Sequence, residues 1–235
     1  MSHFSTNPAI SVRLENMASD ADLYEQFARI GKALASARRV QLLDLLCQGE
    51  RSVDALARTS GMTVTNASQH LHVLRAARLV DARKEGTKVM YRVADDEVCR
   101  FFFALRKLAG LRLAEVEQFV RRYVEGDGDL EPVTRAELLA RAKRDDVVVL
   151  DVRPQDEFAT GHIPGAVSVP LEELEQRLDS LQVDAEVVAY CRGPYCLLAP
   201  RAVELLRARG FKARRLEDGF PEWRLAGLPV AVGEE

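Results

Sequence analysis

The chain contains 235 residues, a length that suits one large domain or two of ordinary size. Its 47% apolar content suits packed cores and its 29% charged content suits a solvated surface, and no apolar run approaches the roughly 18 residues that a membrane span needs. The net charge of −3 is unevenly spread: residues 1–125 carry 19 Lys and Arg against 15 Asp and Glu, and residues 126–235 carry 14 against 21. This asymmetry predicts two domains with different partners and no membrane partner.

The N-terminal segment is predicted to be a tail followed by helices. Residues 1–20 lack the apolar core of a secretion signal, so we expect a mobile tail and a cytoplasmic protein. From residue 21 to residue 57 the apolar residues recur with a helical period. The first helix is marked by apolar residues at steps of four, three and four: Leu23, Phe27, Ile30 and Leu34.

The stretch "GERSVDALARTSGMTVTNASQHLHVL" predicts a short helix, a turn at Gly61-Met62 and a longer helix with Thr63 as its N-cap. On the longer helix an inward apolar stripe is predicted, with polar, uncharged side chains opposite it near the N-terminal end. The stripe consists of Val64, Ala67, Leu71, Leu74 and the stem of Arg78, and the opposite face carries Thr65, Asn66, Gln69 and Val73. This pattern is typical of a helix-turn-helix.

A β-hairpin and a long helix are predicted next. In "LVDARKEGTKVMYRV" apolar residues alternate on either side of residues 85–87, and the basic residues Arg83, Lys84 and Lys88 lie near the tip. After Asp96 a helix is expected to run to about Tyr123. Its apolar arc is broader than one contact needs, which favours packing on its own domain and on a second subunit. A central helix in the core of a monomer is the alternative.

Residues 125–132, "EGDGDLEP", are predicted to be a linker because glycines, acids and a proline dominate them. Beyond the linker, short apolar strands at 147–150, 187–190 and 212–216 alternate with helical pieces near 154–160, 171–180, 197–209 and 219–226. Such alternation predicts an α/β domain with a parallel sheet covered by helices.

The polar start of the longer helix suits the major groove of DNA. Gln and Asn can pair with adenine, Thr can contact a thymine methyl, and a basic hairpin can follow the backbone as a wing. With "IGKALASARRVQLLDLL" and "RKEGTKVMYRV", the span 21–124 resembles the ArsR-type winged helix-turn-helix repressors. The resemblance implies a homodimer on a palindromic double-stranded operator. It places Thr63, Thr65, Asn66, Ser68, Gln69 and His70 on the DNA side.

Many proteins of this type sense metals, but the cysteine and histidine patterns of their metal sites are missing here. His70 and His72 are two residues apart on a helix and therefore do not face each other. Another branch senses persulfides through one thiol in the second helix and one late in the last helix. Cys47 ends the second helix, but Cys99 begins the last one, so both are interpreted as small buried apolar residues.

Two thiols, Cys191 and Cys196, bound the loop "CRGPYC" directly after a predicted strand. Chance, simple packing, a metal site that uses both thiols, a disulfide switch and a nucleophile with a resolving thiol all fit this spacing. Upstream, a polar set that includes His162 is expected to brace the loops above the sheet rather than to form a catalytic Cys–His pair. The set consists of Asp151, Arg153, Glu157 and His162.

With "LDVRPQDEFATGHIPGAVSVP" and "LEDGFPEWRLAGLPV", the span 133–235 resembles a rhodanese domain, the sulfurtransferase module. The resemblance makes Cys191 the acceptor of a sulfane sulfur. The other loop positions implied are Arg192, Gly193 and Tyr195. Members that use thiosulfate commonly end this loop on a basic residue, whereas this chain has Cys196, which is expected to be a resolving thiol. Leu197 replaces the arginine of phosphatase-like relatives, which argues against phosphate or arsenate chemistry.

These observations predict a dimeric DNA-binding repressor that senses reactive sulfur, from small persulfide or polysulfide donors, and releases its operator. We expect no metal and no cofactor. Two alternatives remain open at this point. One is an active sulfurtransferase with an autoregulatory DNA-binding domain, and the other is a soft-metal or arsenite sensor that uses Cys191 and Cys196.

Overall fold

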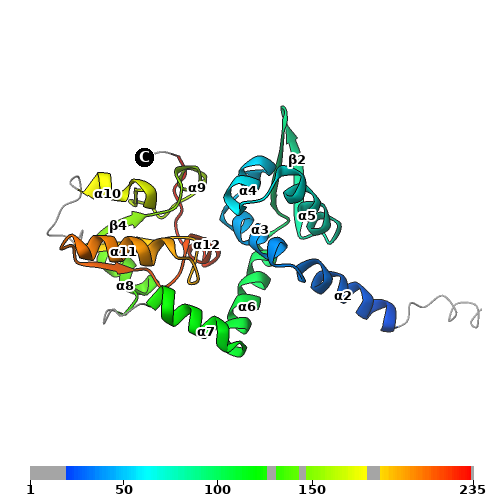
Figure 1. Ribbon diagram of the computed structural model, residues 1–235, viewed down its shortest axis with the longest axis horizontal. Coiled ribbons are helices and arrows are strands. Elements are labelled where there is room, and N and C mark those ends of the chain that lie inside the picture. The colour runs from blue at the N-terminus through cyan, green and yellow to red at the C-terminus, as the bar shows by residue number, and fades with distance from the viewer. Residues whose placement is uncertain (1–19, 126–130, 143–146, 179–185, 234–235) are drawn as a thin grey trace, which may run out of the picture.

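The computed structural model describes residues 20–125, 131–142, 147–178 and 186–233. Figure 1 shows two bodies: a helical N-terminal domain with a projecting hairpin, and an α/β C-terminal domain. The fold class predicted from the sequence is confirmed. The predicted tail and most of the predicted linker lie outside the described residues, and the domain limits 21–124 and 133–235 stay predictions.

The N-terminal domain is a helix-turn-helix with a three-stranded antiparallel sheet of order β1-β3-β2. Side-chain caps start its central helices, because Ser52, Thr63 and Asp95 each accept the amide three residues ahead. The predicted N-cap at Thr63 is therefore confirmed. The elements are α2 (Asp20–Leu34), α3 (Ala37–Gln48), β1 (Arg51–Ser52), α4 (Val53–Ser60), α5 (Val64–Ala76), β2 (Val80–Glu85), β3 (Lys88–Val93) and α6 (Asp96–Arg112).

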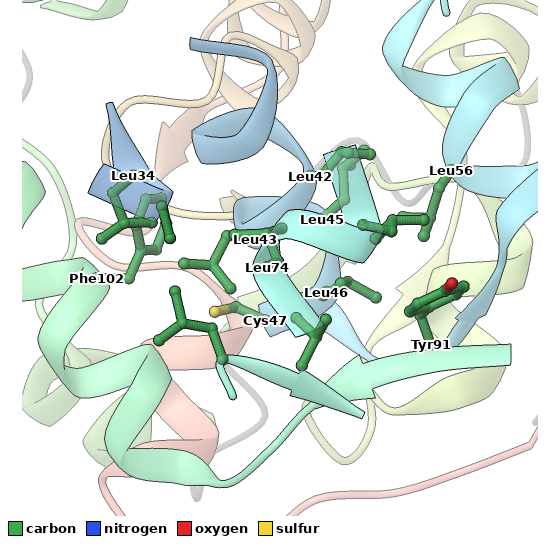
Figure 2. Packing of buried hydrophobic residues seen from close by; sticks show 14 of the residues in the cluster. Leu34, Leu42, Leu43, Leu45, Leu46, Cys47, Leu56, Leu74, Tyr91 and Phe102 are labelled. Carbon is green, nitrogen blue, oxygen red and sulfur yellow. The ribbon is translucent and has the colours of Figure 1, made fainter. Parts of the chain in front are cut away.

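One apolar core holds this domain together (Figure 2). It gathers leucines of α3, α4 and α5 against Tyr91 of the wing and Phe102 of α6. On α5, Ala67, Leu71 and Leu74 face this core as predicted, but Val64 is 45% exposed. Val64 is the first residue of the helix, and Arg78 is exposed and lies beyond the end of the helix at Ala76, so the prediction that these two face inward was wrong.

The predicted long helix to Tyr123 is interrupted. Helix α6 ends at Arg112, Leu113 takes an extended backbone, and α7 (Ala114–Val120) then continues into a π-helical turn (Arg121–Glu125). Figure 1 shows α6 and α7 meeting at an angle. Close to the break, Tyr195 of the second domain lies against Gly110, where a Cβ would come within 2.7 Å of the tyrosine hydroxyl. Glycine weakens the helix at this point and makes room for the contact.

The C-terminal domain has a four-stranded parallel sheet of order β5-β4-β6-β7. The strands and helices predicted for this domain are found within a few residues of their predicted bounds. Elements α8 and β5 were not predicted, nor was the short β1 of the N-terminal domain. The elements are α8 (Arg135–Ala142), β4 (Val147–Asp151), α9 (Gln155–Thr160), β5 (Val167–Ser168), a 3-10 turn (Leu171–Glu173), α10 (Leu174–Arg177), β6 (Glu186–Tyr190), α11 (Leu198–Ala208), β7 (Ala213–Arg215) and α12 (Phe220–Leu225).

Helices cover both faces of this sheet, as a parallel sheet requires. Successive residues of β6 alternate between two cores. Val187 and Ala189 pack with α10 and α11, whereas Val188 and Tyr190 pack with α8, α9 and α12. The strand therefore delivers the next residue, Cys191, at the carboxyl edge of the sheet, where parallel α/β folds build their sites.

Candidate functional site

The loop that carries the two thiols, residues 191–196, is called the thiol loop; it follows β6 and ends just before α11. The Cys196 amide donates to the Gly193 carbonyl over 3.1 Å, which curls the loop. Gly193 has a φ of +150°, a conformation that other residues rarely adopt. Gly219 supports the loop from below, since a Cβ there would lie 2.2 Å from the Gly193 nitrogen, and the next amide, Phe220 N–H, donates to the Cys191 carbonyl over 3.1 Å.

The two thiols of the loop have different environments. Cys191 is 3% exposed, and burial raises the pKa of its thiol. Cys196 is half-buried, and its hydrogen bond with Cys191 lowers its pKa to about 7, with smaller contributions from the amides of Leu198 and Arg192. Of the two thiols, Cys196 is therefore the one that ionises first, near neutral pH. This electrostatic difference is not visible in the sequence, where both are simply cysteines.

Arg192 points to a carboxylate. Its Nε lies 2.9 and 3.0 Å from the two oxygens of Glu157, which is fully buried on α9. Glu157 also pairs with Arg51 of the N-terminal domain, with 2.9 Å between Nη2 and Oε1. One buried carboxylate thus holds the thiol loop and the first strand of the DNA-binding domain at once.

The other residues expected to brace the loops lie beneath the site. Asp151 and Arg153 form a fully buried pair with 2.6 Å between Oδ2 and Nη2, and the same Arg153 nitrogen donates to the Gly161 carbonyl over 2.8 Å. The His162 ring stacks on Phe158 at 3.6 Å between centroids, and its Nδ1 is 3.0 Å from the Phe158 carbonyl. These contacts hold the three side chains in place: Asp151 pairs with Arg153, Arg153 also binds backbone, and His162 contacts the backbone and ring of Phe158.

The thiol loop is packed directly against the DNA-binding domain. The Tyr195 hydroxyl donates to the Arg106 carbonyl on α6 over 3.4 Å, and the Gln48 Nε2 at the end of α3 donates to the Arg192 carbonyl over 3.1 Å. The sequence did not indicate Gln48, or Arg106 and the partners of Arg106 described next, because residues this far apart along the chain leave no local pattern.

Arg106 is the central side chain of this interface. Its guanidinium pairs with Asp44 of α3 at 3.0 Å and with Glu222 of α12. It also lies over the Phe103 ring, 4.4 Å from the centroid, and 5.7 Å from the Tyr195 centroid. Burial raises the pKa of both Asp44 and Glu222, and the Arg106 charge opposes that rise. One arginine therefore joins two helices of the first domain to the second.

A cavity of about 510 Å³ opens between the domains beside Cys196. Its wall combines Val40 and Phe102 of the DNA-binding domain with Cys196 and Leu198 of the thiol loop region. Its charged lining residues are Asp44, Arg106 and Arg192; Asp44 pairs with Arg106, and Arg192 pairs with Glu157. The cavity can therefore admit a small sulfur compound without demanding a strongly anionic one.

The residues expected to contact DNA lie on the opposite side of the N-terminal domain. Thr63, Thr65, Asn66 and Gln69 are exposed at the start of α5, and Ser68 and His70 are half-buried. At the wing, Lys84 and Lys88 are exposed. Arg83 instead pairs with Glu50, with 2.7 Å between Nε and Oε1, and with Glu85. Its charge is compensated within the protein.

Neither a three-ligand metal site nor a membrane span is found in the described ranges. Across them, no three His, Cys, Asp or Glu side chains are grouped so that they could hold a metal ion. Within the same ranges, none of the helices is both long and apolar enough to cross a bilayer.

Comparison with known proteins agrees with this architecture. The family model "Bacterial regulatory protein, arsR family" matches residues 36–82, and that of the rhodanese-like domain matches residues 134–226. HTH-type transcriptional regulator Rv0324 of Mycobacterium tuberculosis is 48% identical over 213 residues, 91% of this chain and 93% of that protein. A sulfurtransferase of Allochromatium vinosum is 31% identical over 94 residues, 40% of this chain and 86% of that protein.

Among solved structures, the homodimeric winged helix-turn-helix DNA-binding domain Mb0332 of Mycobacterium bovis, a fragment studied in solution, is 48% identical. It covers 41% of this chain and 94% of its own, with a TM-score of 0.39. The match to the Mycobacterium tuberculosis regulator over 91% of this chain, together with the two family models, shows the family. The chain belongs to the helix-turn-helix transcriptional regulators that join an ArsR-family DNA-binding domain to a C-terminal rhodanese-like domain.

Proposed function

We propose that this regulator is a repressor that binds its operator in the reduced state and releases it when reactive sulfur modifies the Cys191–Cys196 loop. The observation that carries the proposal is the contact of this loop with α3 and α6 through Tyr195 and Gln48. A regulator bound to the chromosome works in the cytoplasm, where thiols are kept reduced until a sulfur donor appears.

The chemistry uses both thiols of the loop. Cys191 attacks the outer sulfur of a hydropersulfide, the Cys196 thiolate takes the Cys191 proton, and the donor leaves as a thiol, so that Cys191 carries a persulfide. Cys196 then attacks the inner sulfur, and hydrogen sulfide leaves as the Cys191–Cys196 disulfide forms. In sum, one hydropersulfide and two thiols give one disulfide, one thiol and one hydrogen sulfide. The pKa of about 7 at Cys196 suits it to both steps.

Closing this disulfide changes the loop where it meets the DNA-binding domain. Tyr195 and Arg192 lie between the two cysteines, and their contacts to Arg106 and Gln48 hold α6 and α3. Helix α3 packs on the recognition helix α5 in one continuous core. A change of about 1.4 kcal/mol in the balance between two arrangements of these helices is a tenfold change in operator affinity. The decisive test is operator binding with and without a hydropersulfide, in the parent chain and in Cys191→Ser.

For DNA, we propose that the start of α5 enters the major groove and that the wing follows the backbone. The base-side contacts proposed are Thr63, Thr65, Asn66, Ser68, Gln69 and His70. Gln and Asn can bind adenine edges, and the amides at the helix start favour phosphate. Lys84 and Lys88 are the proposed phosphate contacts of the wing. The charge of Arg83 is neutralised by its ion pairs with Glu50 and Glu85, so we expect a smaller contribution from it.

The wing prediction compares two cations of one hairpin. Lys88→Ala should weaken binding to all sequences and lower the slope of log affinity against log salt by about 1, because one phosphate contact is lost. Arg83→Ala should leave that slope unchanged, since its charge is neutralised by Glu50 and Glu85. Fluorescence anisotropy on duplex DNA over a series of salt concentrations measures both. Equal slopes for the two variants would contradict the assignment.

We also propose a homodimer on a palindromic operator. Three apolar side chains share the outer face of α2 and are strongly exposed: Leu23, Tyr24 and Phe27, at 52%, 67% and 60%. An exposed apolar face of this kind favours a partner subunit. Phe27→Glu should shift the chain from the mass of two subunits toward that of one in light scattering. Gln26→Glu adds the same charge on the same helix without removing the apolar side chain and should stay dimeric. A monomeric parent chain would refute the proposal.

A further inference from the structure

A second pair of cysteines lies inside the DNA-binding domain, away from the thiol loop. Cys47 is in the last turn of α3 and Cys99 in the first turn of α6, 52 residues further along the chain. Their sulfur atoms are 2.6 Å apart, and the two residues are 1% and 0% exposed. Figure 2 shows Cys47 within the packed leucines of the domain core. Burial alone was predicted from the sequence, but the contact between the two sulfurs was not.

The surroundings make these two thiols chemically unequal. Hydrogen bonding with Cys47 lowers the pKa of Cys99, and the positive charge of Arg224 on α12 acts in the same direction. The pKa of Cys47 is raised, first by that hydrogen bond and then by burial. Burial of Cys99 opposes this lowering. With their sulfurs in contact, a Cys99 sulfur that is oxidised meets its resolving partner at once.

The pair lies next to a cavity at the domain interface. This cavity has a volume of about 500 Å³ and has Cys47 among its lining residues. Its charged lining comprises three acidic and two basic side chains: Glu50, Asp95, Asp96, Arg92 and Arg224. The complete burial of both sulfurs disfavours bulky disulfides and long polysulfides. It hinders a small neutral oxidant least.

We propose that Cys47 and Cys99 are a second modification site, which hydrogen peroxide converts into a reversible disulfide between α3 and α6. Cys99 gives up its thiol proton and attacks one peroxide oxygen, the O–O bond breaks, and the departing hydroxide takes up that proton to give water and a Cys99 sulfenic acid. Cys47 then attacks the Cys99 sulfur, its thiol proton leaves with the sulfenic hydroxyl as a second water, and the S–S bond forms. Peroxide accepts the two electrons that the thiols lose.

The site is distinct from the thiol loop but acts on the same elements. Helices α3 and α6 also carry Gln48 and Arg106, which contact the loop. A bond between the end of α3 and the start of α6 restricts how these helices move relative to each other. The regulator therefore holds a peroxide-responsive pair in one domain and a proposed sulfur-responsive pair in the other.

The test maps disulfides in the full-length protein after treatment with hydrogen peroxide. In the Cys191→Ser/Cys196→Ser double variant, which lacks the loop thiols, we expect a mass lower by two hydrogens and a peptide pair that joins Cys47 to Cys99. Thiol reductant should reverse both changes. The same background with Cys99→Ala should show neither. Because the double variant keeps Cys47 and Cys99 but lacks both thiols of the thiol loop, this result does not depend on any reaction at that loop.

A melting curve supplies a second measurement. Closing a loop of about 50 residues restricts the unfolded chain, so the oxidised double variant should melt at a higher temperature than its reduced form, without change in the Cys99→Ala background. If Cys99→Ala does not fold, the peptide map of the parent background decides alone. Free, alkylatable thiols at both positions after peroxide treatment and unfolding would overturn the proposal.

Discussion

Cys191→Ser is expected to bind operator DNA with the affinity of the parent protein and to keep it in the presence of a hydropersulfide. The parent should lose at least about tenfold in affinity under the same conditions, the equivalent of about 1.4 kcal/mol. Serine preserves the size of the side chain at the end of β6 but cannot accept a sulfane sulfur. The operator is obtained by selecting duplexes from a random pool with reduced protein, and binding is followed by anisotropy. Release of Cys191→Ser by the donor would refute the sensor function.

Cys196→Ser separates the two steps of the proposed reaction. This variant should accumulate a persulfide on Cys191, seen by intact mass as one added sulfur, whereas the parent should end as a disulfide with no added sulfur. A persulfide that instead accumulates in Cys191→Ser would reverse the order of the thiols. Repeated turnover of thiosulfate to a thiol acceptor, with no effect on DNA, would favour a sulfurtransferase.

The rate of the parent reaction should depend on the Cys196 thiolate. Its pKa is lowered to about 7, so the thiolate is present above that pH and is lost by protonation below it. The rate should therefore rise with pH to half of its maximum near pH 7. In the Cys196→Ser variant this midpoint should move upward, since the raised pKa of Cys191 then controls the attack.

Arg106→Met is expected to be the most destabilising single change at the domain interface. The substitution leaves Asp44 and Glu222, 32% and 14% exposed, without the cation that bridges them. Removing one partner of a buried ion pair costs about 3 kcal/mol, the lower end of the usual range because these groups keep some contact with water. For a chain of this size the melting temperature should fall by roughly 6–12 °C. Arg112→Met, on the exposed last turn of the same helix, should change it little.

The Arg106→Met deficit should also depend on pH. Burial already raises the pKa of Asp44 and Glu222, and without the arginine both should rise further. The pKa values of these two carboxyls are then higher in the folded variant than in the unfolded chain, so the folded state binds more protons in the pH range between them. Lowering the pH through this range therefore stabilises the folded variant. The difference in melting temperature between the variant and the parent should therefore shrink from about pH 7 to about pH 5. A deficit that is constant with pH would show that lost packing on Phe103, not charge, causes it.

The same variant tests the coupling. If Arg106 transmits the state of the loop, Arg106→Met should still form the Cys191–Cys196 disulfide with a hydropersulfide but should retain operator DNA better than the oxidised parent. Loss of disulfide formation together with loss of release would place Arg106 in the reaction rather than in the transmission.

Much of the architecture was predictable because it depends on short windows of sequence. Thr63 caps the helix that follows it because a hydroxyl lies three residues before an amide without a partner. The apolar run of β6 and the glycine at 193 are local in the same way. The limits of this approach appear at Val64 and Leu113, where exposure and a helix break depend on what packs nearby rather than on periodicity.

The sequence by itself determined the kinds of element and the kinds of chemistry: a helix-turn-helix with a basic wing, a parallel sheet, and two thiols on a loop at a strand end. Only the tertiary structure decided which groups meet. The Cys47–Cys99 contact spans 52 residues, and the Arg106–Glu222 pair spans 116 and joins two domains. Such contacts arise when independently formed elements pack together to bury apolar surface, and no periodicity along the chain records the distance between two side chains on different elements.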